Sequence, residues 1–217
     1  MIGRASRAIP LELSGWRMKL RTLTEDDYDD WLEVRVRCRE WLVPWEPRPA
    51  GAPPTPEDRA SFGVRCAARE RERQMGTGYG FGIFVEGRLS GEITLSSIQR
   101  GPFQNAFVGY WVDRSVAGNG LAPEATVAVL RFAFEELGLH RVEIAIVPRN
   151  TPSRRVVEKL DLREEGVARR YLEIDGAWED HVRYAITAEE WEERGRALSQ
   201  TWLKRATRTG GRDGAAR

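Results

Sequence analysis

The sequence lacks the features that mark several classes of protein. Its 217 residues include only two cysteines, Cys38 and Cys66, and no C-x-x-C pair. This excludes a disulfide-rich fold and predicts reduced thiols in a cytoplasmic protein. No apolar run approaches the roughly 18 residues of a membrane span, and the N-terminus has no signal-peptide core. The two histidines stand apart from cysteines and carboxylates, so we predict no metal site.

Net charge is also nearly absent. Lysine and arginine number 34 against 33 aspartates and glutamates, which leaves a net charge of +1. Such a chain has no general attraction for nucleic acid or for a membrane surface. We therefore predict no specific nucleic-acid partner and no membrane partner, and any charged ligand must be bound by a local site.

The chain does contain an ordered series of strand and helix patterns, divided by turn residues. Strands are predicted at 16–23, 81–85, 89–98, 107–112, 141–147, 168–174 and 178–186, and helices at 24–42, 57–75, 123–137, 152–160 and 187–202. This order predicts one domain with a mixed sheet over residues 15–190. Residues 1–14 are expected to form a flexible arm, and 191–217 a C-terminal helix with a flexible basic tail. Six of the 11 prolines fall within 44–56, which predicts an extended loop.

The stretch 107–137 carries the strongest local signal. Aromatic and β-branched residues at 107–112 predict a strand, and Gly118-Asn119-Gly120 then interrupts the apolar pattern. Pro123 suits the first turn of the helix that follows. The free N–H groups of such a helix start attract anions, and glycines allow close approach. The stretch fails the dinucleotide fingerprint G-x-G-x-x-G at its last position, and the chain has no Walker pattern. A turn that only joins strand to helix is the alternative.

The same turn resembles motif A of the GNAT N-acetyltransferases. Ala117-Gly118-Asn119-Gly120-Leu121-Ala122 occupies the place of the family's [QR]-x-x-G-x-[GA] turn, which grips the pyrophosphate of coenzyme A. Ala117 departs from the usual Gln or Arg. Because this binding uses backbone N–H groups, the resemblance implies that Ala117, Gly118, Asn119, Gly120, Leu121 and Ala122 all bind the coenzyme.

Other segments extend the resemblance, in consistent order, over about residues 16–191. They are Trp41-Leu42-x-Pro44-Trp45-Glu46-Pro47, Gly109-Tyr110-Trp111-Val112, Leu139-His140-Arg141-Val142-Glu143, Asn150-x-x-Ser153, Glu158-Lys159-Leu160, Asp175-Gly176-x-Trp178 and Asp180-His181-Val182. Together they resemble the RimJ/RimL branch of GNAT enzymes, which acetylate the N-termini of ribosomal proteins. The resemblance implies an α+β GNAT fold, with a mixed, mostly antiparallel twisted sheet of six to seven strands flanked by helices.

The resemblance also implies roles for residues beside the coenzyme. The strands that end at Val112 and Val147 would splay apart to form a slot for the pantetheine arm, and backbone groups of Trp111 and Val112 would bind that arm and polarise the thioester. Asn150 would bind the coenzyme. The Ser153 hydroxyl would donate a proton to the departing thiolate as the general acid. Local helix capping is the alternative for Asn150 and Ser153.

The general base is less clearly marked. In the RimL-like pattern a glutamate is the candidate base, but Leu172 occupies its position here. The resemblance therefore assigns no general base. Glu92 is our candidate base, with Glu46 and Glu173 as further substitutes, and an ion-paired surface carboxylate is the alternative for each. A peptide α-amine titrates near pH 8, so roughly a tenth is neutral at pH 7 and can lose its proton to water.

The acceptor is expected to bind on an aromatic and acidic surface. Trp45 and Glu46 would face an incoming ammonium group, and Tyr171 would line the other side of the opening. The expected activity is transfer of acetyl from acetyl-CoA to a protein N-terminus, with a ribosomal protein as the candidate. Acetylation of a small-molecule amine, such as an antibiotic or polyamine, and non-catalytic acyl-CoA sensing are the alternatives. The sequence leaves open whether the chain is a monomer or a homodimer.

Overall fold

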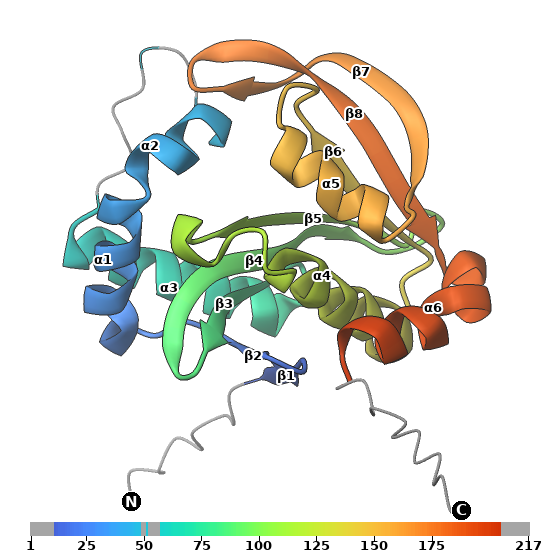
Figure 1. Cartoon of the computed structure of the whole chain (residues 1–217), viewed down its shortest axis with the longest axis horizontal. Coiled ribbons are helices and arrows are strands. Elements are labelled where there is room, and N and C mark those ends of the chain that lie inside the picture. The colour runs from blue at the N-terminus through green and yellow to red at the C-terminus, as the bar shows by residue number, and fades with distance from the viewer. Residues whose placement is uncertain (1–10, 49–50, 52–56, 205–217) are drawn as a thin grey trace, which may run out of the picture.

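The computed structural model describes residues 11–48, 51 and 57–204, and these form a single open sheet covered by helices on both faces (Figure 1). The sheet has eight strands in the order β1-β2-β3-β4-β5-β6-β8-β7. Their bounds are β1 Glu12–Ser14, β2 Met18–Arg21, β3 Tyr79–Val85, β4 Arg88–Gln99, β5 Asn105–Val112, β6 Arg141–Ile146, β7 Arg163–Ile174 and β8 Ala177–Thr187. Every neighbouring pair is antiparallel except β5 and β6, which are parallel.

The helices follow the predicted order. They are α1 Tyr28–Arg37, α2 Arg39–Leu42, α3 Arg59–Met75, α4 Leu121–Arg131, α5 Thr151–Lys159 and α6 Ala188–Trp202, with a π-helical turn over Phe132–Glu136 and 3-10 turns over Glu25–Asp27, Val43–Trp45 and Arg114–Val116. Thr187 caps the start of α6, where its side chain accepts a hydrogen bond from the Glu190 N–H. The predicted domain boundary at residue 190 lies inside α6, and this helix packs on α4 as part of the same domain.

Helix α4 is the centre of the larger core. Every residue from Leu121 to Leu130 is buried, because the β-sheet covers one side of the helix and α5, α6 and the β1–β2 hairpin contact it elsewhere. The opposite face of the sheet carries a smaller cluster, in which Trp31 and Phe62 pack on Phe84 and Leu89. Burial on both faces explains why the middle strands are rich in β-branched and aromatic residues.

The sheet has one strand more than the sequence predicted. β1 lies inside the stretch assigned to a flexible arm, 1–14, and pairs with β2 from Glu12 to Ser14. A strand of only three residues shows no periodicity of its own, so pairing rather than pattern gives it order. The rest of the predicted arm, the predicted tail at 205–217 and most of the proline-rich loop lie outside the described residues.

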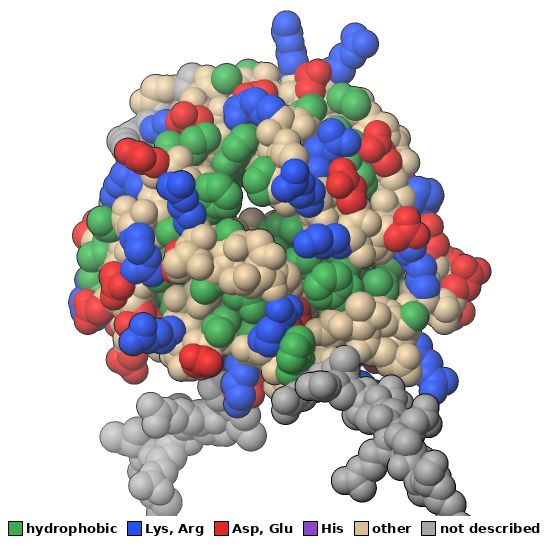
Figure 2. Space-filling model, in the orientation of Figure 1, with side chains coloured by type: hydrophobic (Ala, Val, Ile, Leu, Met, Phe, Trp, Pro, Cys, Tyr) green, Lys and Arg blue, Asp and Glu red, His purple; other side chains and the backbone are tan. Residues whose placement is uncertain are grey.

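Two turns use residues with left-handed backbone. Asp175 and Gly176, with φ of 45° and 82°, join β7 to β8 in a turn that requires left-handed residues. Asp161 follows α5 with φ of 50°, a conformation that aspartate adopts more readily than most residues other than glycine. Charged side chains of both signs are intermixed over the visible face of the molecule, as the net charge of +1 implies (Figure 2).

Candidate active site

The turn that precedes α4 presents a series of backbone N–H groups. Gly118 and Gly120 are left-handed, with φ of 84° and 81°, and Gly120 is the N-cap of α4 without a side-chain cap. Among the described residues, no hydrogen-bond acceptor is found for the N–H groups of residues 118–122. Such a turn at the positive end of a helix suits a diphosphate. Ala117, Asn119, Leu121 and Ala122, predicted from the sequence, belong to this same short segment.

A gap opens beside the turn, between β5 and β6. The two strands pair only at Asn105–Phe107 with Arg141–Glu143, whereas β6 pairs with β8 along its whole length. Beyond Phe107 the strands separate, and Figure 1 shows β6, β8, β7 and α5 rising away from β5. Figure 2 shows the surface hollowed between these two parts. In an antiparallel strand, the N–H and C=O groups of alternate residues point away from the partner strand. The groups of β5 that point away from β4 therefore face the gap.

The end of β5 is held in place by side chains from α1 and α2. Trp41 donates a hydrogen bond from Nε1 to the Val112 carbonyl at 3.3 Å. Arg37 pairs with Asp113 at 2.6 Å, and this arginine helps to hold the pKa of the Asp113 carboxyl below its usual value despite its burial. Trp111 and Val112, the predicted pantetheine contacts, are therefore on a fixed strand end that borders the gap.

Helix α5 begins on the opposite side of the gap. Asn150 accepts a hydrogen bond from the Ser153 N–H at 3.2 Å, so the Asn150 side chain acts as a helix cap. The Ser153 hydroxyl caps nothing; it lies 3.0 Å from the hydroxyl of Tyr110, which reaches across from β5. Burial raises the pKa of the Tyr110 phenol above its usual value, so this group stays protonated. Sequence reasoning assigned Tyr110 no functional role, although strand alternation places it on the α4 side of β5 with Val108.

The predicted acceptor residues belong to two segments that are joined by backbone hydrogen bonds. Backbone hydrogen bonds join the tip of the β7–β8 hairpin to the segment after α2. The Asp175 N–H donates to the Glu46 carbonyl at 3.0 Å, and the Arg48 N–H donates to the Glu173 carbonyl at 2.9 Å. These bonds bring the hairpin that carries Tyr171 to the segment that carries Trp45. The Arg149 guanidinium lies over the Trp45 ring at 4.7 Å.

The carboxylates proposed for the acceptor side already have partners. Glu46 forms an ion pair with Arg35, which is itself mostly buried. Glu92 accepts hydrogen bonds from Trp31 at 2.8 Å and from Arg65 at 2.9 and 3.0 Å. Glu92 lies opposite Trp111 in the β4–β5 ladder, so it is near the end of β5. Its role as a base stays a prediction, and the structure gives this carboxylate a structural role as well.

The sequence matches the Acetyltransferase (GNAT) domain family over residues 17–163. The chain belongs to the GNAT acetyltransferase family. GNAT acetyltransferases use acetyl-CoA, and the mixed α/β fold expected from the resemblance is confirmed.

Individual relatives of this GNAT chain confirm its likeness to the RimJ/RimL group. It is 28% identical over 193 residues to the [Ribosomal protein uS5]-alanine N-acetyltransferase of Escherichia coli, a match covering 88% of this chain and 98% of that protein. It is 46% identical over 110 residues to the Probable N-acetyltransferase YjcK of Bacillus subtilis, where the match spans 50% of this chain and 61% of the relative. Among solved structures, Mycobacterium smegmatis RimJ in complex with CoA-disulfide superposes with a TM-score of 0.81, at 33% identity, covering 88% of this chain and 93% of that one.

Two further properties of the GNAT domain concern metals and membranes. Within residues 11–48, 51 and 57–204 there is no group of three or more histidine, cysteine or carboxylate side chains that could hold a metal ion. None of the described helices is long and apolar enough to cross a membrane.

Proposed function

We propose that this GNAT enzyme transfers the acetyl group of acetyl-CoA to the α-amine at the N-terminus of a protein, and that a ribosomal protein is its substrate. The observation that carries the proposal is the separation of β5 from β6 directly beside the N-terminal turn of α4. The ribosomal substrate is supported by the likeness to the uS5-alanine acetyltransferase, which extends over most of both chains.

Binding of the coenzyme is assigned to main-chain groups. The N–H groups of residues 118–122 have no hydrogen-bond acceptor among the described residues and so are available to a diphosphate, and the helix dipole adds to their attraction for negative charge. Gly118 leaves open space where a side chain would project, since a Cβ there would have no neighbour within 4 Å. In this proposal Asn150 orients the start of α5 next to the coenzyme while it caps the helix.

The coenzyme supplies an acetyl group as a reactive thioester, and the chain supplies orientation and a proton. N–H groups at the end of β5, beside Trp111 and Val112, would polarise the thioester carbonyl. The Ser153 hydroxyl would donate a proton to the sulfur as the C–S bond breaks. The Tyr110 hydroxyl lies 3.0 Å from that hydroxyl and 3.3 Å from the Ser153 carbonyl, and because its own pKa is raised it stays protonated and can donate to either oxygen.

The acceptor amine is assigned to the rim that carries Trp45, Glu46 and Tyr171. An α-amine is already roughly one tenth neutral at pH 7, so its proton can pass to water without a strongly basic side chain. A lysine ε-amine, with a pKa of about 10.4, has well under one neutral molecule in a thousand at this pH. The partnered state of Glu46 and Glu92 therefore fits an N-terminal amine better than a lysine side chain.

Thiol release with a panel of acceptors tests the proposal. Peptides with a free N-terminal amine should release coenzyme A from acetyl-CoA, whereas the same peptides with a blocked N-terminus and an internal lysine should not. Release with polyamines or antibiotics but not with peptides would identify a small-molecule acetyltransferase. Binding of acetyl-CoA without release on any acceptor, including intact ribosomal proteins, would identify a sensor. Mass spectrometry of the modified peptide locates the acetyl group.

A further inference from the structure

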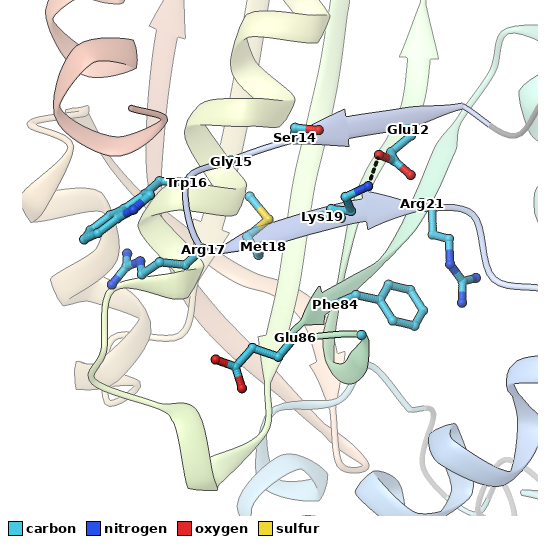
Figure 3. Close-up of a pocket in the computed structure, with 11 residues that line it drawn as sticks. Glu12, Ser14, Gly15, Trp16, Arg17, Met18, Lys19, Arg21, Phe84 and Glu86 are labelled. Atoms are coloured by element: carbon cyan, nitrogen blue, oxygen red, sulfur yellow. Dashed lines mark ion pairs between the residues drawn. The ribbon is translucent and has the colours of Figure 1, made fainter. Parts of the chain in front are cut away.

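One arginine far away in the sequence contacts the main chain of the turn before α4. Arg17 directly precedes β2 and lies 102 and 103 residues from Asn119 and Gly120. Its guanidinium donates to the carbonyl of Asn119 and, at 3.1 Å, to the carbonyl of Gly120. Figure 3 shows the Arg17 side chain extending from the β1–β2 hairpin towards the start of α4, beside Trp16.

The same arginine is held by a buried carboxylate. Glu124, in the first turn of α4, is fully buried and accepts hydrogen bonds from Nε of Arg17 and from the Arg17 backbone N–H, both at 2.7 Å. The hairpin approaches Glu124 so closely that a Cβ at Gly15 would lie 2.3 Å from Oε1 of Glu124. Hairpin, arginine and helix start are therefore fixed as one unit.

This contact helps to fix the direction of two N–H groups of the turn. In a trans peptide the C=O and the N–H of the same unit point in opposite directions. The carbonyls of Asn119 and Gly120 belong to the units that carry the N–H groups of Gly120 and Leu121. Arg17 binds both carbonyls with one guanidinium, and the Gly120 carbonyl also accepts the Glu124 N–H of α4 at 3.2 Å. The N–H groups of Gly120 and Leu121 therefore point away from the arginine.

Charge supports the same conclusion. A fully buried carboxylate in the first turn of α4 would repel a diphosphate bound at the turn, and the Arg17 guanidinium neutralises it. Arginine suits this position because its rigid fork can serve a carboxylate and two carbonyls together, whereas lysine offers one flexible ammonium group.

We propose that Arg17 is a positioning residue for the coenzyme: it binds the carbonyls of the turn and thereby holds the N–H groups of Gly120 and Leu121 in the direction that binds the diphosphate. This inference rests on the proposed function, in which the diphosphate of coenzyme A binds at this turn. Arg17 acts through the main chain and does not touch the reacting atoms.

The test compares two donors in two arginine variants. Arg17→Lys keeps a positive charge beside Glu124 but loses the fork. Arg21→Lys is the matched control, because Arg21 lies in the adjoining strand β2, is about as exposed as Arg17, and forms a two-point ion pair with Asp27 at 2.6 and 2.8 Å. The donors are acetyl-CoA and S-acetylpantetheine, which lacks the diphosphate and the nucleotide.

We expect Arg17→Lys to weaken coenzyme A binding by roughly tenfold in calorimetry and to raise the KM for acetyl-CoA to a similar extent. The kcat at saturating acetyl-CoA, and kcat/KM for S-acetylpantetheine, should stay within about twofold of wild type. Arg21→Lys should leave all of these values unchanged. Because lysine retains the charge, a loss in Arg17→Lys reports lost geometry of the turn.

Two possible results distinguish the positioning role of Arg17 from the assignment of the coenzyme site. If the wild type prefers coenzyme A to pantetheine and Arg17→Lys retains that preference in full, the positioning role is wrong while the proposed function stands. If the wild type binds both compounds equally, the diphosphate does not bind at this turn, and the coenzyme site assigned under the proposed function fails. Thermal unfolding of both variants shows whether each is folded. If Arg17→Lys does not fold, the amide chemical shifts of Gly120 and Leu121 provide a second measurement. They are compared between Arg17→Gln, which loses the guanidinium, and Trp16→Ala, which keeps it. Unchanged shifts in Arg17→Gln would overturn the proposal.

Discussion

The donor side and the acceptor side of this site are built in different ways. On the donor side, the candidate ligands are main-chain N–H groups within 118–122, fixed by left-handed glycines and by Arg17. On the acceptor side, the candidate groups are side chains from two separate segments, joined where the β7–β8 hairpin tip meets residues 46–48. Because main-chain groups are the same in every residue, few substitutions can alter the binding groups of the donor side. On the acceptor side, each substitution of a side chain alters them. This difference allows one acetyl donor to be kept while the acceptor changes.

The largest expected effect is on the donor side. Gly120→Glu should weaken coenzyme A binding by about 100-fold or more in calorimetry, because a carboxylate would enter the group of N–H donors. Its Cβ would lie only 3.2 Å from Nη2 of Arg17 and 3.3 Å from the Trp202 ring, so the arginine would also be displaced.

The control for this variant is Gly87→Glu in the β3–β4 turn. Gly87 has the same φ of 81°, and a Cβ there would have no neighbour within 4 Å. Both variants place a glutamate at the same left-handed φ, so the control accounts for that strain, while the contacts with Arg17 and Trp202 occur only at Gly120. Equal coenzyme affinities in the two variants would contradict the assignment of the donor side.

Next in size is the effect of the proton donor that lies between the two sides. Ser153→Ala should slow turnover at saturating substrate by roughly 100-fold with little change in coenzyme affinity, since the hydroxyl acts only as the C–S bond breaks. The helix cap is preserved in this variant, because the Asn150 side chain binds the Ser153 backbone N–H.

Tyr110→Phe should lower kcat by a smaller factor, about tenfold, because it removes the partner of the Ser153 hydroxyl and leaves the hydroxyl itself in place. The double variant should be no slower than Ser153→Ala alone if the two groups act as one unit. Additive losses in steady-state kinetics would separate Tyr110 from the proton donor.

The sequence predicts the donor side far better than the acceptor side. Glycines at 118 and 120, and Pro123 in the helix that follows, are local signals, and the helix begins at Leu121, two residues before the predicted start. The partners that complete the donor side could not be found in this way. Arg17 lies more than 100 residues from the turn, and only the fold brings the β1–β2 hairpin to Glu124. The eighth strand was missed for a related reason, since pairing with β2 gives it its order.

On the acceptor side, residue type alone was a weaker guide. Glu46 and Glu92 are acidic and near the gap, as the sequence suggested, but the sequence could not show that Arg35 and Arg65 bind them. Ion pairs between distant segments leave no periodicity in the chain. The same limit applies to Ser153, whose hydroxyl bonds to a tyrosine 43 residues away rather than to its own helix.

A smaller effect on rate is expected for Glu92. Glu92→Gln should change kcat by less than about threefold and lower the free energy of unfolding by about 1–3 kcal/mol, because it removes the negative charge that pairs with Arg65, while the amide oxygen can still accept the bond from Trp31. Denaturant unfolding and the pH–rate profile measure the two quantities. If turnover instead slows by about 100-fold and the profile loses its acidic limb, Glu92 is the general base.

The smallest expected effect is a pH dependence confined to the acceptor side. Burial lowers the pKa of His181 below its ordinary value of 6.5, so the folded protein favours the neutral ring. Because the unfolded chain binds the proton more readily, this contribution to stability is present above pH 6.5 and is lost as the pH falls towards the folded pKa.

Melting temperatures measured between pH 7.5 and 5.5 should therefore fall less steeply in His181→Gln than in the wild type. The ring lies against Tyr171, at 5.5 Å between centroids, so acceptor KM should rise over the same range while coenzyme affinity changes little. An equal slope in both proteins would show that other groups control the transition.

On the donor side, main-chain N–H groups of residues 118–122 are proposed to bind the diphosphate of coenzyme A. Titration of ¹⁵N-labelled protein with coenzyme A and with pantetheine, following each assigned amide, tests this binding. We expect coenzyme A to shift the amides of Gly118, Asn119, Gly120, Leu121 and Ala122 strongly, and pantetheine to leave them in place while shifting amides at the end of β5. Coenzyme A binding that shifts other regions and leaves these five amides unchanged would contradict it.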